Sequence, residues 1–219
     1  MGKIFAYIDG FNSYHCLKNA IEDKNTKLIE KNKWINYRKL ISLFFGKNDN
    51  IDKIMFFSAI PYHLSKDKIK KHKAYYEILK KYCNIEVVNG RFGEKFVNLE
   101  CKHCGKISKK IKKHEEKETD VAVAINILYD ALTVKDLDTI VIISADTDFI
   151  PIVKMILDKT NKKIKILFPI NSKINNKFQE IKNNNYKSKS IKETHIIKSQ
   201  IPDIVNIKGK TYKTPYLNS

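Results

Sequence analysis

The chain has 219 residues, of which 42% are hydrophobic, so it can build one domain with a sizeable core. No apolar run approaches the ~20 residues that span a bilayer, Asp9 interrupts any leader-like start, and four cysteines are too few for a secreted disulfide framework. A soluble, cytoplasmic protein with no membrane partner is expected.

The formal net charge of +18 favours a polyanionic partner, because neutralised phosphates release condensed counterions. Only Arg38 and Arg91 among the basic residues are arginine, however, and the chain is also rich in Ile and Asn. An A/T-rich genome would impose the same profile, so the charge is supporting evidence only.

The first half of the chain begins with a short apolar run at 3–8, predicted to be a strand, and a predicted helix at 11–23. A second helix is predicted at 34–46, with Gly46 as its stop. A strand at 51–60 and a Lys-rich amphipathic helix at 66–82 follow. This order is how an α/β domain begins.

The second half repeats the alternation after one interruption. A strand is predicted at 85–90, and residues 91–114 are predicted to form an inserted basic hairpin with a CxxC motif. The later elements are a helix at 118–133, a strand at 139–144, a helix at 148–158 and a strand at 163–169. This pattern predicts a Rossmann-like three-layer sandwich with a mostly parallel central sheet.

The domain is expected to occupy residues 1–182. Residues 183–219 are polar at first and then carry scattered apolar residues, and are predicted to be a C-terminal extension that packs on the domain or is partly flexible.

Carboxylates gather where strands of this sheet end. Asp9 follows the first strand, with Asn12 one turn on, and Asp146 and Asp148 follow the strand at 139–144. Asp120 lies in the first turn of the helix at 118–133. Ligands of open α/β sheets bind outside the carboxyl ends of the strands, so these residues are expected to converge there.

Each motif has a plainer explanation when it is taken alone. Asp-Gly after a strand is commonly a turn, Asp146 or Asp148 could cap a helix, and Asp120 would favour a helix dipole. Their coincidence at one sheet edge favours a metal site. Hard oxygen ligands favour Mg²⁺ or Mn²⁺, and such ions support phosphodiester cleavage.

Three segments in this order resemble the NYN-domain family, a branch of the PIN-like nucleases: DGFN at 9–12, EKETDV at 116–121 and SADTDFIP at 144–151. The segment SQIPD at 199–203 is similar to the C-terminal extension of bacterial members. Ala145 is a departure, because family members usually have glycine there, and a methyl group would matter if the position needs a positive φ.

The resemblance implies a divalent-metal-dependent nuclease acting on RNA, most simply an endoribonuclease. It implies direct metal contacts for Asp9 and Asp146, with Asp120 and Asp148 as further ligands or bases. Asn12 would orient substrate or water. Further candidates for substrate binding are Lys117, Ser144, Thr147, Lys109 and Lys110.

Lys117 would either neutralise a phosphate or pair with neighbouring glutamates. The lysine run around 102–113 is either a grip for the RNA backbone or a solvated loop. Phe92 and Phe96 near it could stack on unpaired bases, although core packing is the safer prediction for both.

Cys101 and Cys104 are spaced as half of a tetrahedral zinc site, with His114 as a third candidate ligand. A reduced cysteine pair in a turn is the equal alternative. A homodimer also stays open.

Two other functions share these features. One is a catalytically silent RNA-binding module of the same fold. The other is a small-molecule phosphohydrolase, which would normally need a tighter motif around its phosphoryl-accepting aspartate than DGFN.

Overall fold

A computed structural model describes residues 2–100 and 107–214. Its centre is a six-stranded sheet in the order β3-β2-β1-β6-β7-β8, and every pair in it is parallel. The strands are β1 Lys3–Asp9, β2 Ile51–Ser58, β3 Glu86–Asn89, β6 Leu137–Ile143, β7 Lys163–Phe168 and β8 Tyr186–Ser190. The predicted Rossmann-like α/β fold with a parallel central sheet is confirmed.

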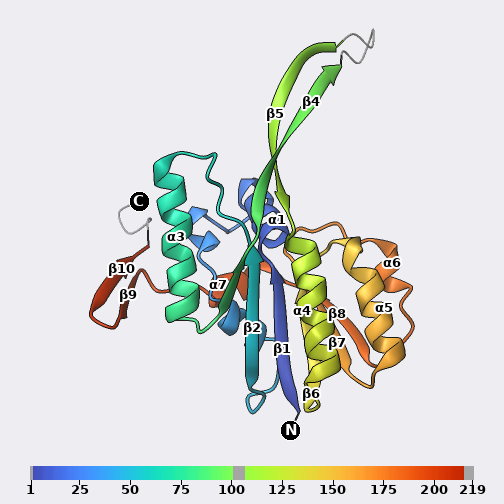
Figure 1. The fold of residues 1–219 in the computed structure, drawn as a ribbon. Helices are drawn as coiled ribbons and strands as arrows, with labels where there is room; N and C mark the ends of the chain where they lie inside the picture. The colour runs from blue at the N-terminus through green and yellow to red at the C-terminus, as the bar shows by residue number, and fades with distance from the viewer. Residues whose placement is uncertain (1, 101–106, 215–219) are drawn as a thin grey trace.

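Helices cover both faces of the sheet and make it the middle of three layers (Figure 1). One face packs against α1, α2, α3 and α7, and the other against α4, α5 and α6. The helices are α1 Gly10–Glu22, α2 Tyr37–Ser42, α3 Lys66–Lys81, α4 Thr119–Thr133, α5 Ile150–Lys159, α6 Asn176–Gln179 and α7 Glu193–Lys198, with short 3₁₀ turns η1 Glu30–Lys33 and η2 Thr147–Phe149.

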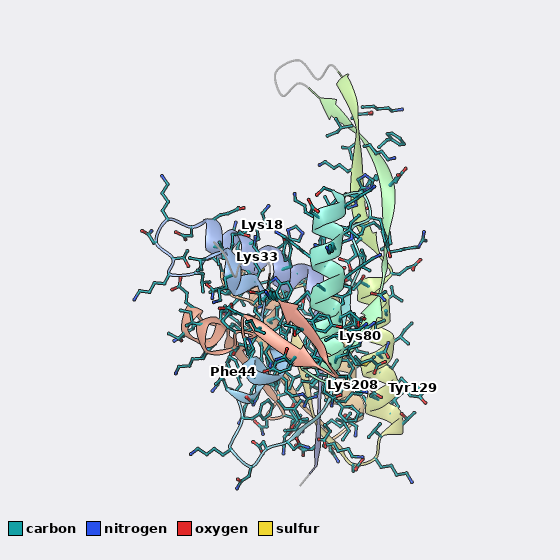
Figure 2. All side chains as sticks on the ribbon, turned by 90° about the vertical axis from the view of Figure 1, so that its left-hand side faces the viewer. Lys18, Lys33, Phe44, Lys80, Tyr129 and Lys208 are labelled. Atoms are coloured by element: carbon teal, nitrogen blue, oxygen red, sulfur yellow. The ribbon has the colours of Figure 1, made fainter. Side chains whose placement is uncertain are left out.

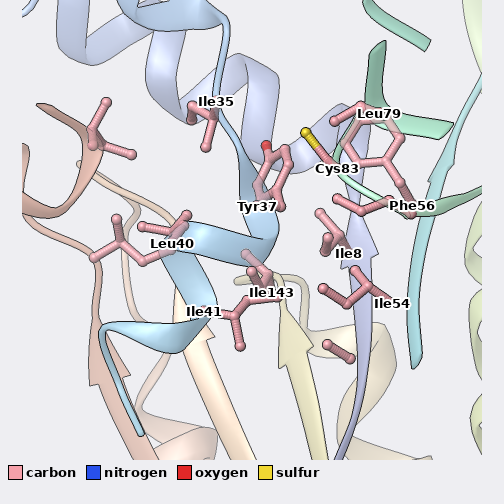
Figure 3. Close-up of a cluster of buried hydrophobic side chains, with 14 of the residues drawn as sticks. Ile8, Ile35, Tyr37, Leu40, Ile41, Ile54, Phe56, Leu79, Cys83 and Ile143 are labelled. Carbon is pink, nitrogen blue, oxygen red and sulfur yellow. The ribbon is translucent and has the colours of Figure 1, made fainter. Parts of the chain in front are cut away.

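Strand β1 is buried on both faces because successive side chains point to opposite cores. Ala6 and Ile8 join the first core, and Phe5 and Tyr7 join the second. Figure 3 shows Ile8 beside Ile54 and Ile143 in the first core. Fully burying a side chain of this size stabilises the fold by roughly 1.5–3 kcal/mol, so the centre of the sheet holds its carboxyl edge firmly.

The strand order reverses between β1 and β6. From β1 the chain moves outward to β2 and β3, and from β6 it moves the other way to β7 and β8. The loops that leave β1 and β6 at their carboxyl ends therefore separate to opposite faces. Such a switch point is where doubly wound sheets bind ligands.

The insertion after β3 is a long antiparallel hairpin of β4 Arg91–Glu100 and β5 Ile107–Lys117. It projects from the carboxyl edge of the sheet, away from the three layers (Figure 1). The hairpin predicted at 91–114 is present and runs three residues further. Its CxxC motif lies outside the described residues.

The helix predicted at 34–46 spans only Tyr37–Ser42. The Asn36 side chain caps its start, and the turns after it close through i→i+3 bonds, as from Leu43 N to Leu40 O and from Phe44 N to Ile41 O. Lys165 Nζ donates a hydrogen bond to the carbonyl oxygen of Phe44 at 2.9 Å. Because of these bonds the helix ends at Ser42, although the apolar residues continue through Leu43 and Phe44.

Part of the segment 183–219 belongs to the sheet, because Tyr186–Ser190 pairs with β7 as edge strand β8. Beyond it, Ile191, Ile196 and Ile201 are buried in the first core. The described chain ends in a small hairpin of β9 Ile204–Ile207 and β10 Lys210–Lys213. No helix in the described part of the chain is both long and apolar enough to cross a membrane.

Candidate functional site

Asp9 ends β1 and begins α1. Its carboxylate accepts a hydrogen bond from Asn12 N at 2.9 Å, which makes it the N-cap of the helix, and its side chain is buried with 3% of the residue exposed. A plain turn was the simpler explanation for Asp9-Gly10, and the structure instead makes Asp9 a helix cap. The bond from Asn12 N uses Oδ1 only, and Oδ2 faces the neighbouring strand.

Packing against β2 requires a glycine at position 10. A Cβ at this position would lie 2.4 Å from Phe56 Cζ and 2.7 Å from the carbonyl oxygen of Phe57. Only glycine lets α1 start this close to β2, so Gly10 holds Asp9 at the sheet edge.

Ser144 follows β6 directly and connects the two central strands. Its hydroxyl donates to Asp9 Oδ2 at 2.9 Å and accepts from Asp146 N at 3.1 Å. Asn12 adds a second link, because its Oδ1 accepts from Ala145 N at 3.1 Å. The first and third motifs, which are more than 130 residues apart, form one hydrogen-bonded unit.

Asp146 and Asp148 lie on the turn that leaves β6. Asp146 caps η2 by accepting from Asp148 N at 3.0 Å, so the capping alternative holds for it as well. Thr147 lies half-buried between them. The turn directs both carboxylates outward at the carboxyl edge.

Asp120 joins these two from the first turn of α4. One carboxylate oxygen from each of Asp120, Asp146 and Asp148 lies within 4.8 Å of the others, and this acidic group is half-buried to exposed. The predicted convergence of the second and third motifs is seen here. Asp9 lies outside the group but close enough for charge coupling to two of its members.

Electrostatics in the site disfavour negative charge. Burial raises the pKa of the Asp9 carboxyl to about 6, and the charges of Asp120 and Asp146 add to this against the hydrogen bonds from Asn12 and Ser144. Burial and the charges of Asp146 and Asp148 raise the pKa of Asp120. Within the described chain, none of the four aspartates forms an ion pair with a lysine or arginine.

Glu116, at the base of β5, belongs to the site and was missed as a site residue. Burial raises the pKa of its carboxyl to about 7, with further increases from Asp9 and Asp120 and a decrease from the Thr119 hydroxyl. Thr119 Oγ1 donates to Oε1 at 2.7 Å, while Oε2 is buried without a hydrogen-bond partner among the described residues. Its place in the EKETDV segment, four residues before Asp120, was the available signal.

The three lysines predicted to bind substrate lie on β5 and differ in their surroundings. Lys117 Nζ contacts Glu115 Oε2 at 2.7 Å, so the predicted pairing with a neighbouring glutamate is present. Lys110 is exposed on β5. Lys109 pairs with Leu99 in the hairpin, but its side chain is outside the described set. RNA binding by these lysines stays a prediction.

The zinc prediction rests on residues that the structure does not describe, since Cys101 and Cys104 are among 101–106. His114 lies opposite Glu94 at the base of the hairpin, roughly 23 Å along β5 from Ile107 at ~3.3 Å a residue. Its ring stacks on that of His63 with centroids 4.0 Å apart.

Ala145 adopts no left-handed conformation, because the non-glycine residues with positive φ in the described chain are Asn84, Glu118, Asn171 and Lys208. The methyl group packs at the edge of the second core. The departure from glycine therefore imposes no backbone strain on the acidic turn.

Comparisons with known proteins agree with this geometry. A family model described as NYN domain matches residues 3–189. A solved structure of a protein of unknown function from Vibrio parahaemolyticus is similar over 87% of this chain and 93% of that chain, with 16% sequence identity and a TM-score of 0.54, a likeness of fold alone. No curated protein matches the chain.

Proposed function

The chain belongs to the NYN domain family, and from its PIN-like nuclease fold we propose that it is a divalent-metal-dependent ribonuclease that cleaves RNA phosphodiester bonds. The observation that carries the proposal is the acidic group of Asp120, Asp146 and Asp148, which lies at the switch point of the sheet. Asp9 and Glu116 lie beside it with raised pKa values.

The side chains present fit a divalent cation. Three carboxylates within 4.8 Å repel one another, and burial together with the charges of Asp146 and Asp148 raises the pKa of Asp120. A cation among them would remove the cost. Asp120, Asp146 and Asp148 would hold it, with Asp9 as a further ligand.

The donor set also favours particular ions. It is made of carboxylate oxygens, with no sulfur or imidazole, which suits Mg²⁺ or Mn²⁺ better than zinc. Such an ion, when bound, supplies Lewis-acid stabilisation for the charge that builds on a phosphodiester during hydrolysis.

The protein's own groups orient the reaction. The Asn12 carbonyl is held by Ala145 N, which leaves its amide nitrogen to donate to a phosphate oxygen or a water. Ser144 fixes Asp9 and the start of the acidic turn together. Glu116 lies beside this unit with one carboxylate oxygen that no described residue hydrogen-bonds, and this suits it to accept or return a proton.

The openness of the site supports a polymeric substrate over a small phosphoester. Asp120 and Asp148 are exposed, and Asp146 is half-buried. A chain that enters and leaves can cross such a surface, and this supports cleavage within the chain. The net charge of +18 adds long-range attraction for RNA.

The test is an RNA cleavage assay with Mn²⁺ or Mg²⁺, repeated in EDTA and with Asp146→Asn. Asp158→Asn is the matched control, because it removes the same charge from the far end of α5, where Asp158 pairs with Lys159. The parent and the control should cleave, and EDTA or Asp146→Asn should abolish cleavage. Loss of a circular RNA, which has no ends, would identify endonucleolytic cleavage.

Equal cleavage by Asp146→Asn and the parent would mean a contaminating nuclease and would end the proposal. RNA binding without metal-dependent cleavage would favour the silent module. Hydrolysis of a small phosphoester but not of RNA would favour the phosphohydrolase.

A further inference from the structure

Aromatic and imidazole rings form an unbroken series along the carboxyl edge of the sheet. We call it the ring track, and its members in spatial order are Tyr14, His15, Phe11, Phe92, His63 and His114. The centroids of successive rings are 5.6, 4.3, 6.3, 4.9 and 4.0 Å apart. The series joins three segments that are distant in sequence.

The ring track is built on two segments that also carry residues of the candidate site. Phe11 lies between Gly10 and Asn12 in the first motif, and Glu116 and His114 are two residues apart on β5. Residues two apart on a strand share a face, so the hairpin face that presents Glu116 also presents His114. By pairing, this face also carries Phe92 opposite Glu116 and Glu94 opposite His114.

The same face continues up the hairpin with an aromatic ring and lysines. The next pairs along it are Phe96 with Lys112 and Asn98 with Lys110. Phe96 is 64% exposed, and Lys110 is exposed. Lys112 pairs with Glu94 at the surface, a contact that contributes little on its own. In Figure 2 side chains project from the hairpin clear of the three layers.

The rings do not serve the core. Neither hydrophobic core of the described chain includes a member of the ring track, nor Phe96. Phe11 and Tyr14 are 37% and 38% exposed, and the rings of His15 and His63 are exposed too. The safer prediction of core packing is wrong for Phe96. A contiguous row of exposed rings is typical of a binding surface.

We infer that the ring track and its extension through Phe96 bind unpaired bases of an RNA strand whose backbone crosses the acidic group. This rests on the proposed function and names its substrate as single-stranded RNA. Bases stack on aromatic rings without regard to sequence, while lysines track the backbone. A duplex hides its base faces, so it could use only the lysines.

The direct test is RNA binding in EDTA, where no cleavage occurs. Fluorescence anisotropy would follow a short labelled RNA without self-complementarity, and the same RNA annealed to its complement. Phe96→Ala is the first variant, because its exposed ring can be removed without unfolding the chain. Phe92→Ala is the second. Tyr129→Ala removes a ring that is 65% exposed on α4, outside the ring track, and is the matched control.

The parent should prefer the single strand. Phe96→Ala should weaken single-strand binding by about fivefold or more and leave duplex binding unchanged, and Phe96→Trp should restore it. Tyr129→Ala should bind like the parent. Unchanged single-strand affinity in Phe96→Ala and Phe92→Ala, or equal losses for both RNAs, would overturn the inference.

The two proposals fail separately. If the parent cleaves RNA and both phenylalanine variants bind RNA normally, only the inference about the ring track is overturned. If the parent cleaves no RNA but its single-strand binding depends on Phe96, only the proposed nuclease activity is overturned. Absence of any RNA binding would overturn the inference and point to a protein partner.

Discussion

The Ser144 hydroxyl donates to Asp9 Oδ2 at 2.9 Å and so connects the carboxyl ends of the two central strands. The Ser144 hydroxyl oxygen also accepts a hydrogen bond from Asp146 N at 3.1 Å. Ser144 is 2% exposed, so water does not compete for these bonds. One small side chain therefore fixes the buried carboxylate and the acidic turn relative to each other.

Removal of this hydroxyl should lower the stability of the protein and raise the pKa of Asp9. Ser144→Ala leaves a buried carboxylate oxygen without its donor, which should cost about 1–3 kcal/mol in the free energy of unfolding. It should also raise the pKa of Asp9 further, because the Ser144 bond lowers it. Urea denaturation and NMR titration of Asp9 measure these effects. Unchanged stability and an unchanged pKa would show that the bond contributes nothing in solution.

The acidic group should destabilise the metal-free protein. Asp120→Asn removes a charge that burial and two neighbouring carboxylates disfavour, so its melting temperature in EDTA should exceed that of the parent. Mn²⁺ should raise the melting temperature of the parent far more than that of the variant. Asp158→Asn is the control and should respond to Mn²⁺ like the parent. An Asp120→Asn protein that melts lower in EDTA would mean that the dipole of α4 outweighs the repulsion.

The contributions of Asp9 and Glu116 to the stability of the metal-free protein should fall as pH rises from about 4 to about 7. The folded pKa is about 6 for Asp9 and about 7 for Glu116, against ordinary values of 3.8 and 4.5. Over this interval the folded state holds protons that the unfolded chain has released, so deprotonation favours unfolding. For Asp9 the cost at neutral pH is about 3 kcal/mol.

The readout for this pH dependence is the difference between variants, since carboxylates paired with lysines, such as Glu94 and Asp138, shift the other way. Asp9→Asn and Glu116→Gln should each gain stability relative to the parent as pH rises through this interval, measured by denaturation in EDTA at a series of pH values. Profiles parallel to that of the parent would contradict the raised pKa values.

Gly10→Ala should destabilise the protein by about 2 kcal/mol or more, because the new methyl group would overlap the Phe56 ring and the Phe57 carbonyl. Gly46→Ala is the matched control, since its Cβ would meet only the Asp49 side chain at 3.2 Å. Urea midpoints compare the two variants. Equal, small effects would show that α1 can move away from β2, and that Asp9 is held less tightly than the packing indicates.

Much of this protein is determined locally by its sequence. Strand β1 is buried on both faces and its apolar run is continuous, so its type and its end at Asp9 could be predicted. Helices α3 and α4 carry their apolar faces at helical spacing. The acidic residues could be found because motifs that follow strands of a parallel sheet meet at one edge.

Only the tertiary structure decided the strand order, and with it the bond between Ser144 and Asp9. Strand β8 escaped prediction because an edge strand with mostly exposed side chains has no apolar pattern. Glu116 is buried by elements distant in sequence, and the ring track joins α1, the loop after β2 and the hairpin. Such contacts depend on residues far apart along the chain, and their energies leave no periodic signal in the local sequence.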